Sequence, residues 1–476
     1  MSRSTYDAVV VGAGPNGLAA AIELARNGCS VAVLEADNIV GGGTRSAELT
    51  LPGFVHDLGS AIHPLGFASP FFRSLPLEEH GLEWIHPPAP LAHPFDDGTA
   101  AILERSVDET AEALGPDAQA YRRLVRDVSA DVEKIIATLL GKPRPLRHPL
   151  AFSASALRGA RPARALAEAF FEGEKAKGLF AGNAAHSFLS LEERPSGLFG
   201  LVLSVLGHAA GCGWPFPRGG SQKIADALAS YLRSLGGEIY TGVRVSSLAD
   251  VPLTRTVLFD LTPRQVLDIA GDHFTPRYRK ALARYRYGPG VFKVDFALDG
   301  PIPWEAEECL RAGTVHLGGT LDEISAGEAA VTRGEHPERQ FVLLAQQSLF
   351  DETRAPEGKH TVWTYCHVPN GSTFDMTERI EAQIERFAPG FRGRILAKNA
   401  WGTTDLERWN ANLIGGDING GLMDLRQLLA RPMARANPYS TSAPGLYICS
   451  SSTPPGGAVH GLCGFMAARS ALRYLK

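Results

Sequence analysis

The chain has 476 residues, too many for one hydrophobic core, so about two domains are expected. Hydrophobic residues make up 44% and charged residues 21%, an ordinary balance for a folded globular protein. The net charge of −4 gives no reason to expect nucleic acid as a partner. The six cysteines form no C-x-x-C pair and no zinc-like cluster, which predicts reduced thiols, no metal site and no disulfide-reductase chemistry.

A dinucleotide-binding pattern occupies the beginning of the chain. A strand, a glycine-rich turn, a helix and a second strand are predicted at residues 6–11, 12–17, 18–27 and 30–34. Gly12 permits the tight turn, Gly14 lets backbone N–H groups approach a pyrophosphate, and Gly17 lets helix and strand pack closely. Glu35 follows Gly14 by 21 residues, about the distance at which an acidic residue meets ribose hydroxyls. The predicted ligand is an adenine dinucleotide.

A second segment of small residues decides which dinucleotide is favoured. Gly42, Gly43 and Thr44 follow the ribose acid within ten residues, and Arg45 adds a cation. This resembles the second FAD-contacting segment of glutathione-reductase-type flavoproteins, which simple NAD dehydrogenases lack. FAD is therefore favoured over NAD, and the less favoured interpretation of Arg45 is a solvated arginine beside a flexible loop. The short polar start before residue 6 predicts no signal peptide and a cytoplasmic protein.

The next stretch begins a second domain. Residues 91–95 and 99–103 flank Asp97 and Gly98, which predicts a hairpin, and residues 108–140 have helical spacing with a break at Gly115.

Residues 141–215 combine positive charge with a strongly apolar run. Basic residues precede it, namely Lys142, Arg144, Arg147, Arg158, Arg161 and Arg164. The apolar run, 198–206, is too short to span a bilayer. A helical lid over the active site or an oligomer interface is favoured for this segment, and a peripheral membrane contact is the alternative.

Periodic patterns place the following elements. Ser221 is a predicted N-cap of a helix, and two strands at 238–241 and 243–248 are expected to return the chain to the nucleotide-binding sheet. The alternating run 291–298 predicts a half-buried strand. Antiparallel strands of the second domain are predicted at 341–346 and 361–368.

The end of the chain predicts another contact with the cofactor. A strand, a small-residue loop and a terminal helix are expected at residues 446–449, 450–459 and 461–476.

Five motifs lie along the chain, at residues 10–20, 52–57, 217–222, 288–295 and 455–461. Together they resemble phytoene-desaturase-like flavoproteins, in particular the branch that contains pyridine nucleotide-disulfide oxidoreductase domain-containing protein 2. The resemblance implies an α/β fold with a Rossmann-like FAD-binding domain of glutathione-reductase type and an interleaved α+β substrate domain, similar to monoamine oxidase and phytoene desaturase. The FAD-binding domain is expected at 1–65, 215–288 and 430–476, and the substrate domain at 66–214 and 289–429.

The same resemblance adds further residues to the expected cofactor site. The terminal helix would point its N-terminus at the flavin, and the backbone contacts would come from Val243, Gly456, Gly457 and Val459. The chain departs from the family pattern in having Ser450 where a glycine is usual and Pro454 where a histidine is common.

Two other histidines are weak catalytic candidates. His63 follows the first FAD segment and His460 opens the terminal helix, so either could move the proton that accompanies hydride transfer. A hydrogen-bonded structural role is the more ordinary interpretation of each.

The sequence therefore predicts an FAD-dependent oxidoreductase that exchanges hydride between flavin N5 and a carbon of an apolar, polyene-like or lipid-like substrate. A flavin amine or amino-acid oxidase is the alternative enzyme, and a flavin-stabilised interaction protein with little turnover is the alternative of another class. Oxygen, a quinone or NAD(P)H is the expected electron partner. A homo-oligomer is left open.

Overall fold

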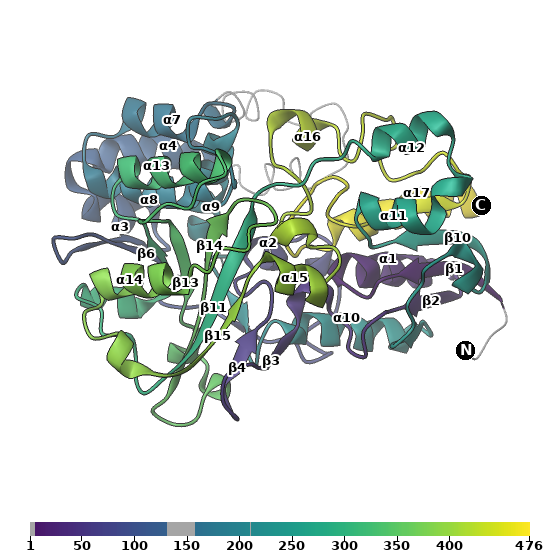
Figure 1. Cartoon of the computed structure of the whole chain (residues 1–476), viewed down its shortest axis with the longest axis horizontal. Coiled ribbons are helices and arrows are strands. Elements are labelled where there is room, and N and C mark those ends of the chain that lie inside the picture. Colours follow the sequence, from purple (N-terminus) through teal and green to yellow (C-terminus); the bar gives the residue numbers. More distant parts are fainter. Residues whose placement is uncertain (1–4, 131–157, 210) are drawn as a thin grey trace.

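The computed structural model describes residues 5–130, 158–209 and 211–476, and two sheets with their helices form its framework (Figure 1). Lys142, Arg144 and Arg147, and the last ten residues of the helical pattern predicted at 108–140, lie outside the described residues.

The first sheet is parallel and has five strands. Their order is β16-β10-β1-β2-β9, and every neighbouring pair is parallel. The strands are β1 (Thr5–Val11), β2 (Val31–Leu34), β9 (Glu238–Tyr240), β10 (Leu253–Phe259) and β16 (Leu446–Ile448). The predicted Rossmann-like sheet is therefore present. Gly12, Glu35 and Asp260 each follow the carboxyl end of a strand, the edge at which such sheets bind ligands.

Three helices cover one face of this sheet: α1 (Pro15–Arg26), α10 (Gln222–Ser234) and α17 (Leu462–Leu475). Helix α1 begins with Pro15, whose missing N–H costs nothing at the first helical position. Gly464 lets α17 pack directly on the start of α1, because a Cβ at residue 464 would lie 1.8 Å from the Asn16 carbonyl oxygen. Strand β1, at the start of the described residues, and helix α17, at their end, both lie at this side of the molecule (Figure 1).

The second sheet has seven strands in the order β15-β11-β14-β13-β12-β6-β7. It is antiparallel except for the parallel pair β6 and β12. The strands are β6 (Ala89–Pro94), β7 (Ala100–Leu103), β11 (Gly290–Leu298), β12 (Ala312–Leu317), β13 (Val342–Ala345), β14 (His360–Val368) and β15 (Ile395–Trp401). The predicted hairpin and the predicted pairing of the strands near 341–346 and 361–368 are both present.

Strand β11 corrects one expectation, because all nine of its residues are buried and it is not half-exposed. The side chains alternate between two covered faces. Phe292, Val294 and Phe296 pack in one hydrophobic cluster with Ile384 of helix α14 (Thr377–Phe387). Lys293 occupies the opposite face, as its place in the strand requires. The alternation in the sequence correctly assigned the side chains to two faces of the strand. Both faces are buried because other elements cover the sheet on each side.

Helices gather beyond one end of the seven-stranded sheet (Figure 1). They are α3 (Val107–Ala113), α4 (Ala118–Ala130), α7 (Ala163–Phe170), α8 (Glu174–Ala185), α9 (Ser196–His208) and α13 (Leu321–Thr332). A 3₁₀ turn at Gly115–Asp117 separates α3 from α4, as the predicted break requires.

One local prediction is wrong, and another holds in position only. Residues 243–247 form an irregular loop instead of a strand, and a 3₁₀ turn at Leu248–Asp250 follows, because the Ser247 side chain caps that turn. Ser221 stands at the N-cap of α10, but its hydroxyl accepts no capping bond from the helix. The hydroxyl instead lies 2.7 Å from His63 Nε2.

Short elements complete the described fold. The strands are β3 (Ser46–Glu48), β4 (Val55–Asp57), β5 (Trp84–Ile85) and β8 (Phe216–Pro217); the helices are α2 (Pro64–Phe67), α11 (Pro263–Ala270), α12 (Pro276–Leu282), α15 (Thr403–Trp409) and α16 (Leu425–Leu429). None of the helices in the described ranges is both long and apolar enough to cross a membrane.

Candidate active site

A cavity of about 760 Å³ is lined by residues of both sheets and of α9. We call one part the nucleotide end; it is lined by Gly12, Gly14, Glu35, Asp37, Gly42, Gly43, Thr44, Arg45, Val243 and Asp260. We call the other part the substrate end; it is lined by His186, Leu198, Phe199, Val202, Leu203, Val205, Leu206, Val291, Lys293, Thr314, Leu343, Trp363 and Tyr365.

Most of the expected cofactor contacts meet at this cavity. Gly457 and Val459 of the C-terminal loop line it together with the residues of the nucleotide end. Gly17 and Gly456 do not line it. Gly17 faces the preceding turn, where a Cβ would lie 2.0 Å from the Gly12 carbonyl oxygen, and a Cβ at Gly456 would lie 2.9 Å from Arg431 Nη1. These two glycines allow neighbouring groups to pack closely against the backbone next to the site.

Glu35 is held in place by backbone donors. Its Oε2 accepts a bond of 2.7 Å from the N–H of Ala13, and its Oε1 accepts one of 2.9 Å from the N–H of Asp37. Each carboxylate oxygen keeps a further lone pair, which suits the hydroxyls of a ribose. The structure thus brings the predicted ribose acid to the glycine-rich turn.

Arg45 is a buried residue of the cavity wall rather than a solvated arginine. Its guanidinium pairs with Asp37, donates to the Trp409 carbonyl oxygen at 3.2 Å, and lies 4.8 Å from the centre of the Trp409 ring. Burial alone would raise the pKa of Asp37, but the bond from Arg45 outweighs it and the pKa is lowered. Asp37 is therefore the counter-ion of Arg45.

Asp260 is a candidate site residue of the cavity wall that the sequence reasoning missed. It follows β10, and its Oδ2 accepts a bond of 2.9 Å from the N–H of Gly17. Burial raises its pKa to about 7; the Gly17 N–H opposes this shift and the negative charge of Glu35 adds to it. The signal was available, since the apolar run ending at Phe259 leads into an acid just as the run ending at Leu34 leads into Glu35.

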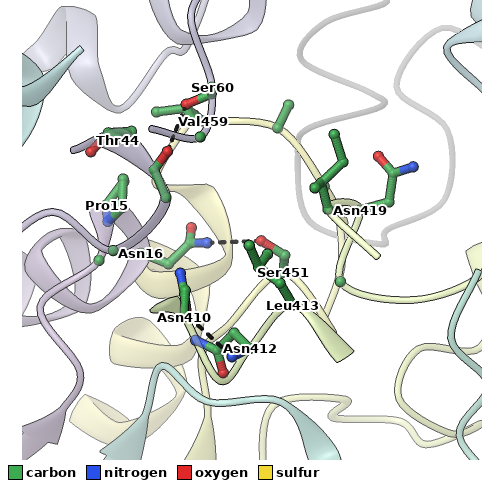
Figure 2. Close-up of a pocket in the computed structure, with 18 of the residues that line it drawn as sticks. Pro15, Asn16, Thr44, Ser60, Asn410, Asn412, Leu413, Asn419, Ser451 and Val459 are labelled. Atoms are coloured by element: carbon green, nitrogen blue, oxygen red, sulfur yellow. Dashed lines mark hydrogen bonds between the residues drawn. The ribbon is translucent and has the colours of Figure 1, made fainter. Parts of the chain in front are cut away.

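The C-terminal loop and the loop after α15 meet the glycine-rich turn at the cavity (Figure 2). Asn16 Nδ2 points at Ser451 Oγ at 3.4 Å, and Asn410 and Asn412 lie beside this pair. Asn16 Oδ1 is buried and has no partner in the described structure. Asn412 Nδ2 donates to the Asp260 carbonyl oxygen at 3.0 Å, so this loop is tied to the parallel sheet.

The two candidate histidines occupy different surroundings. His63 lines the cavity, and burial lowers its pKa to about 4. His460 is fully buried and does not line the cavity; its Nδ1 accepts a bond of 3.1 Å from the N–H of Leu462, at the start of α17. Both arrangements give a neutral imidazole with a structural hydrogen bond. A catalytic role for either stays a prediction, and the mechanism proposed below uses neither.

Lys293 brings a buried amine to the substrate end. Its Nζ pairs with Asp295, two residues along β11 on the same face, and lies 5.9 Å from the centre of the Trp363 ring. Burial lowers the pKa of Lys293, against the attraction of Asp295, and burial raises the pKa of Asp295 to about 6. Opposite charges at i and i+2 in an otherwise apolar strand were the sequence signal for this pair.

The site fits FAD. Three strand ends, a helix N-terminus and glycines without side chains form a cradle, in which a Cβ at Gly42 would lie 3.0 Å from the Gly14 Cα. The unpartnered Asn16 Oδ1 and the Glu35 carboxylate supply polar groups along it. In the described ranges no three side chains of the metal-binding types gather around one point, and all six cysteines are free thiols.

This fold and this site define an FAD-dependent oxidoreductase. Residues 16–461 match the family described as flavin-containing amine oxidoreductase, and the chain belongs to this family. The family match outweighs the alternative of an interaction protein with little turnover.

Known proteins resemble the chain over nearly its whole length. Pyridine nucleotide-disulfide oxidoreductase domain-containing protein 2 of Rattus norvegicus is 28% identical, covering 100% of this chain and 94% of that protein. Phytoene dehydrogenase of Streptomyces griseus is 28% identical, covering 91% and 85%. Cyclohexylamine oxidase from Brevibacterium oxydans has a similar structure, with a TM-score of 0.60, 16% identity and 99% and 98% coverage. These matches confirm the suspected relationship, the fold class and FAD.

The raised pKa of Asp260 predicts that FAD binding weakens with rising pH. Above about pH 7 the carboxylate places a second negative charge, besides Glu35, at the loop for the anionic pyrophosphate. A coupling of one pKa unit corresponds to roughly tenfold weaker FAD binding at high pH. Asp260→Asn keeps an acceptor for Gly17 and should abolish this dependence, measured by flavin fluorescence while apoprotein is titrated with FAD.

Asp37→Asn is the matched control. The pKa of Asp37 is lowered, so its charge is constant over this pH range and the variant should keep the pH dependence of the wild type. Equal pH dependence in wild type and in Asp260→Asn would contradict the assignment.

Proposed function

We propose that the protein is a desaturase or dehydrogenase that exchanges hydride between FAD and a carbon of an apolar substrate, of polyene, terpenoid or lipid type. The observation that supports this proposal is the apolar lining of the substrate end. Helix α9 alone contributes six apolar side chains to it, Leu198, Phe199, Val202, Leu203, Val205 and Leu206. Because this helix turns its apolar surface into the cavity, we assign it as a lid or wall rather than as a membrane contact.

An amine substrate is less well supported. A cationic amine needs a carboxylate or a free aromatic face, and the acidic residues that line the cavity, Glu35, Asp37 and Asp260, all belong to the nucleotide end. Trp363 and Tyr365 pack edge to face, with ring centres 5.2 Å apart, so nothing fits between them. Lys293 Nζ already lies over the Trp363 ring, so this aromatic face is not free for a substrate cation.

FAD, when bound, supplies hydride acceptance and donation. The chain's own residues would position a substrate C–C bond against it, exclude water and manage one proton. In desaturation, one carbon loses a hydride and its neighbour loses a proton, leaving a double bond. Lys293, whose lowered pKa favours the neutral amine, is the proposed acceptor of that proton. Saturation uses the same groups in reverse.

Oxygen, a quinone or a transiently bound nicotinamide is the proposed electron partner, because only one dinucleotide fingerprint occurs in the sequence. The domain limits given by the sequence remain part of this proposal, as do the individual FAD contacts.

Anaerobic visible spectra test the proposal. We expect bleaching of the bound flavin by detergent-dispersed terpenes or polyenes, and none by putrescine or cyclohexylamine. Bleaching by the amines alone would overturn the proposal in favour of an amine oxidase. A parallel sample with NADPH reports the direction, since bleaching by NADPH indicates a saturase.

A further inference from the structure

A histidine pair interrupts the apolar wall of the substrate end. His186, the residue that ends α8, lines the cavity, and its Nε2 lies 3.0 Å from Nε2 of the fully buried His316 on β12. Both imidazoles pack against Trp214, with ring centres 5.6 Å apart in each case. Two facing Nε2 atoms at this distance share one proton, so one ring donates and the other accepts.

Both rings are neutral. Burial lowers the pKa of His186 to about 3. Burial also lowers the pKa of His316 well below its ordinary value, and the neighbouring His186 adds to this shift. Each imidazole therefore carries a single proton. Either His316 donates to His186, or His186 donates to His316.

The surroundings of His316 decide between these tautomers. Its Nδ1 is buried without a partner, and a Cβ at Gly182 would lie only 2.8 Å from it, so the nitrogen faces a glycine Cα. A proton on this nitrogen would be a buried N–H with no acceptor, which is rarer and costlier than a bare acceptor nitrogen. His316 thus carries its proton on Nε2 and donates it to His186 Nε2.

His186 must then carry its own proton on Nδ1. The single hydrogen bond of its ring within the described structure is the one to His316, and its Nδ1 is not among the buried side-chain atoms without a partner. The ring that carries this N–H lines the cavity. Thr314, on the same face of β12 as His316, also lines the cavity, and its buried hydroxyl has no partner.

We propose that His186 and Thr314 form a subsite that binds a neutral oxygen of the substrate, a carbonyl or hydroxyl group. The inference rests on the proposed function and narrows it, because it makes the substrate an oxygenated apolar molecule rather than a pure hydrocarbon. His186 acts here as a binding residue that orients the substrate, and His316 fixes its tautomer. A carboxylate is not the expected ligand, since neither group supplies a positive charge.

Two terpenes of similar size, limonene and its ketone analogue carvone, test this subsite. We expect the FAD-loaded wild type to bind carvone roughly two- to tenfold more tightly than limonene, the gain of one hydrogen bond, measured from the perturbed flavin spectrum. His186→Phe should remove the preference. His186→Asn, whose amide can place a donor near the position of Nδ1, should retain it.

Thr314→Val supplies a second test that breaks no existing hydrogen bond, and it should reduce the preference. Equal binding of both terpenes to the wild type, or an undiminished preference in His186→Phe, would overturn the subsite while leaving the proposed function intact. Binding of neither terpene would count against both. Nitrogen-15 spectra of the imidazoles give an independent readout, in which a protonated Nε2 in His186 contradicts the tautomer.

Discussion

Replacing Arg354 with methionine should lower the free energy of unfolding by roughly 3–5 kcal/mol. Arg354 pairs with Asp57, and both side chains are about 1% exposed. Asp57 also accepts bonds from Ser46 Oγ at 2.6 Å and from the N–H of Ser221 at 2.7 Å. Removal of the guanidinium leaves a buried carboxylate without its counter-ion. Urea unfolding of the FAD-loaded protein measures the loss.

The effect of this variant should depend on pH with a defined sign. Burial alone would raise the pKa of Asp57, but Arg354 and the other donors outweigh it and the pKa is lowered. A lowered pKa gives stability that is present above the unfolded-state value, about 4, and is lost as the pH falls. The deficit of Arg354→Met should therefore be largest near neutral pH and shrink in acid.

Arg333→Met is the matched control. Arg333 pairs with Glu335, but both side chains are more than half exposed, so solvent screens the pair and only a small loss of stability is expected. Similar losses in the free energy of unfolding for the two arginine variants would contradict the prediction that the buried pair stabilises the fold more than the exposed pair.

The nucleotide end could be predicted from the sequence because most of its residues lie close together along the chain. Gly12, Gly14 and Glu35 lie within one strand–turn–helix–strand unit, so their spacing along the chain fixes their spacing in space. The C-terminal loop could be added only through family resemblance, because β16 reaches the sheet by pairing with the distant β10.

The substrate end could not be assembled in the same way. His186, Lys293 and Trp363 come from a helix and two strands separated by 70 residues or more, and only the tertiary fold brings them to one cavity. The identities of the side chains gave partial signals, such as the charged pair in β11. Burial of both faces of that strand is a property of the finished sheet, which explains why alternation was misread as exposure.

Lys293→Met should lower the rate of flavin bleaching by an apolar substrate by about 10²–10⁴-fold, the usual contribution of a positioned acid or base. Methionine fills a similar volume without an amine. The fold should tolerate the change, because burial already raises the pKa of Asp295 to about 6 and the loss of Lys293 raises it further, so the carboxyl becomes neutral. FAD content, read from the visible spectrum, should be unchanged.

A proton-accepting amine also predicts a pH profile for this step. In the wild type the bleaching rate during substrate oxidation should rise with pH as the ammonium of Lys293 loses its proton, at a pH below the ordinary value for lysine because burial lowers this pKa. That rising limb should disappear in Lys293→Met. Lys398→Met on the neighbouring strand β15 removes a half-exposed lysine that pairs with the buried Glu381 and does not line the cavity, and it should leave both rate and profile unchanged. If Lys293→Met keeps the limb at a reduced rate, Lys293 only shapes the cavity, and the proton goes to another group.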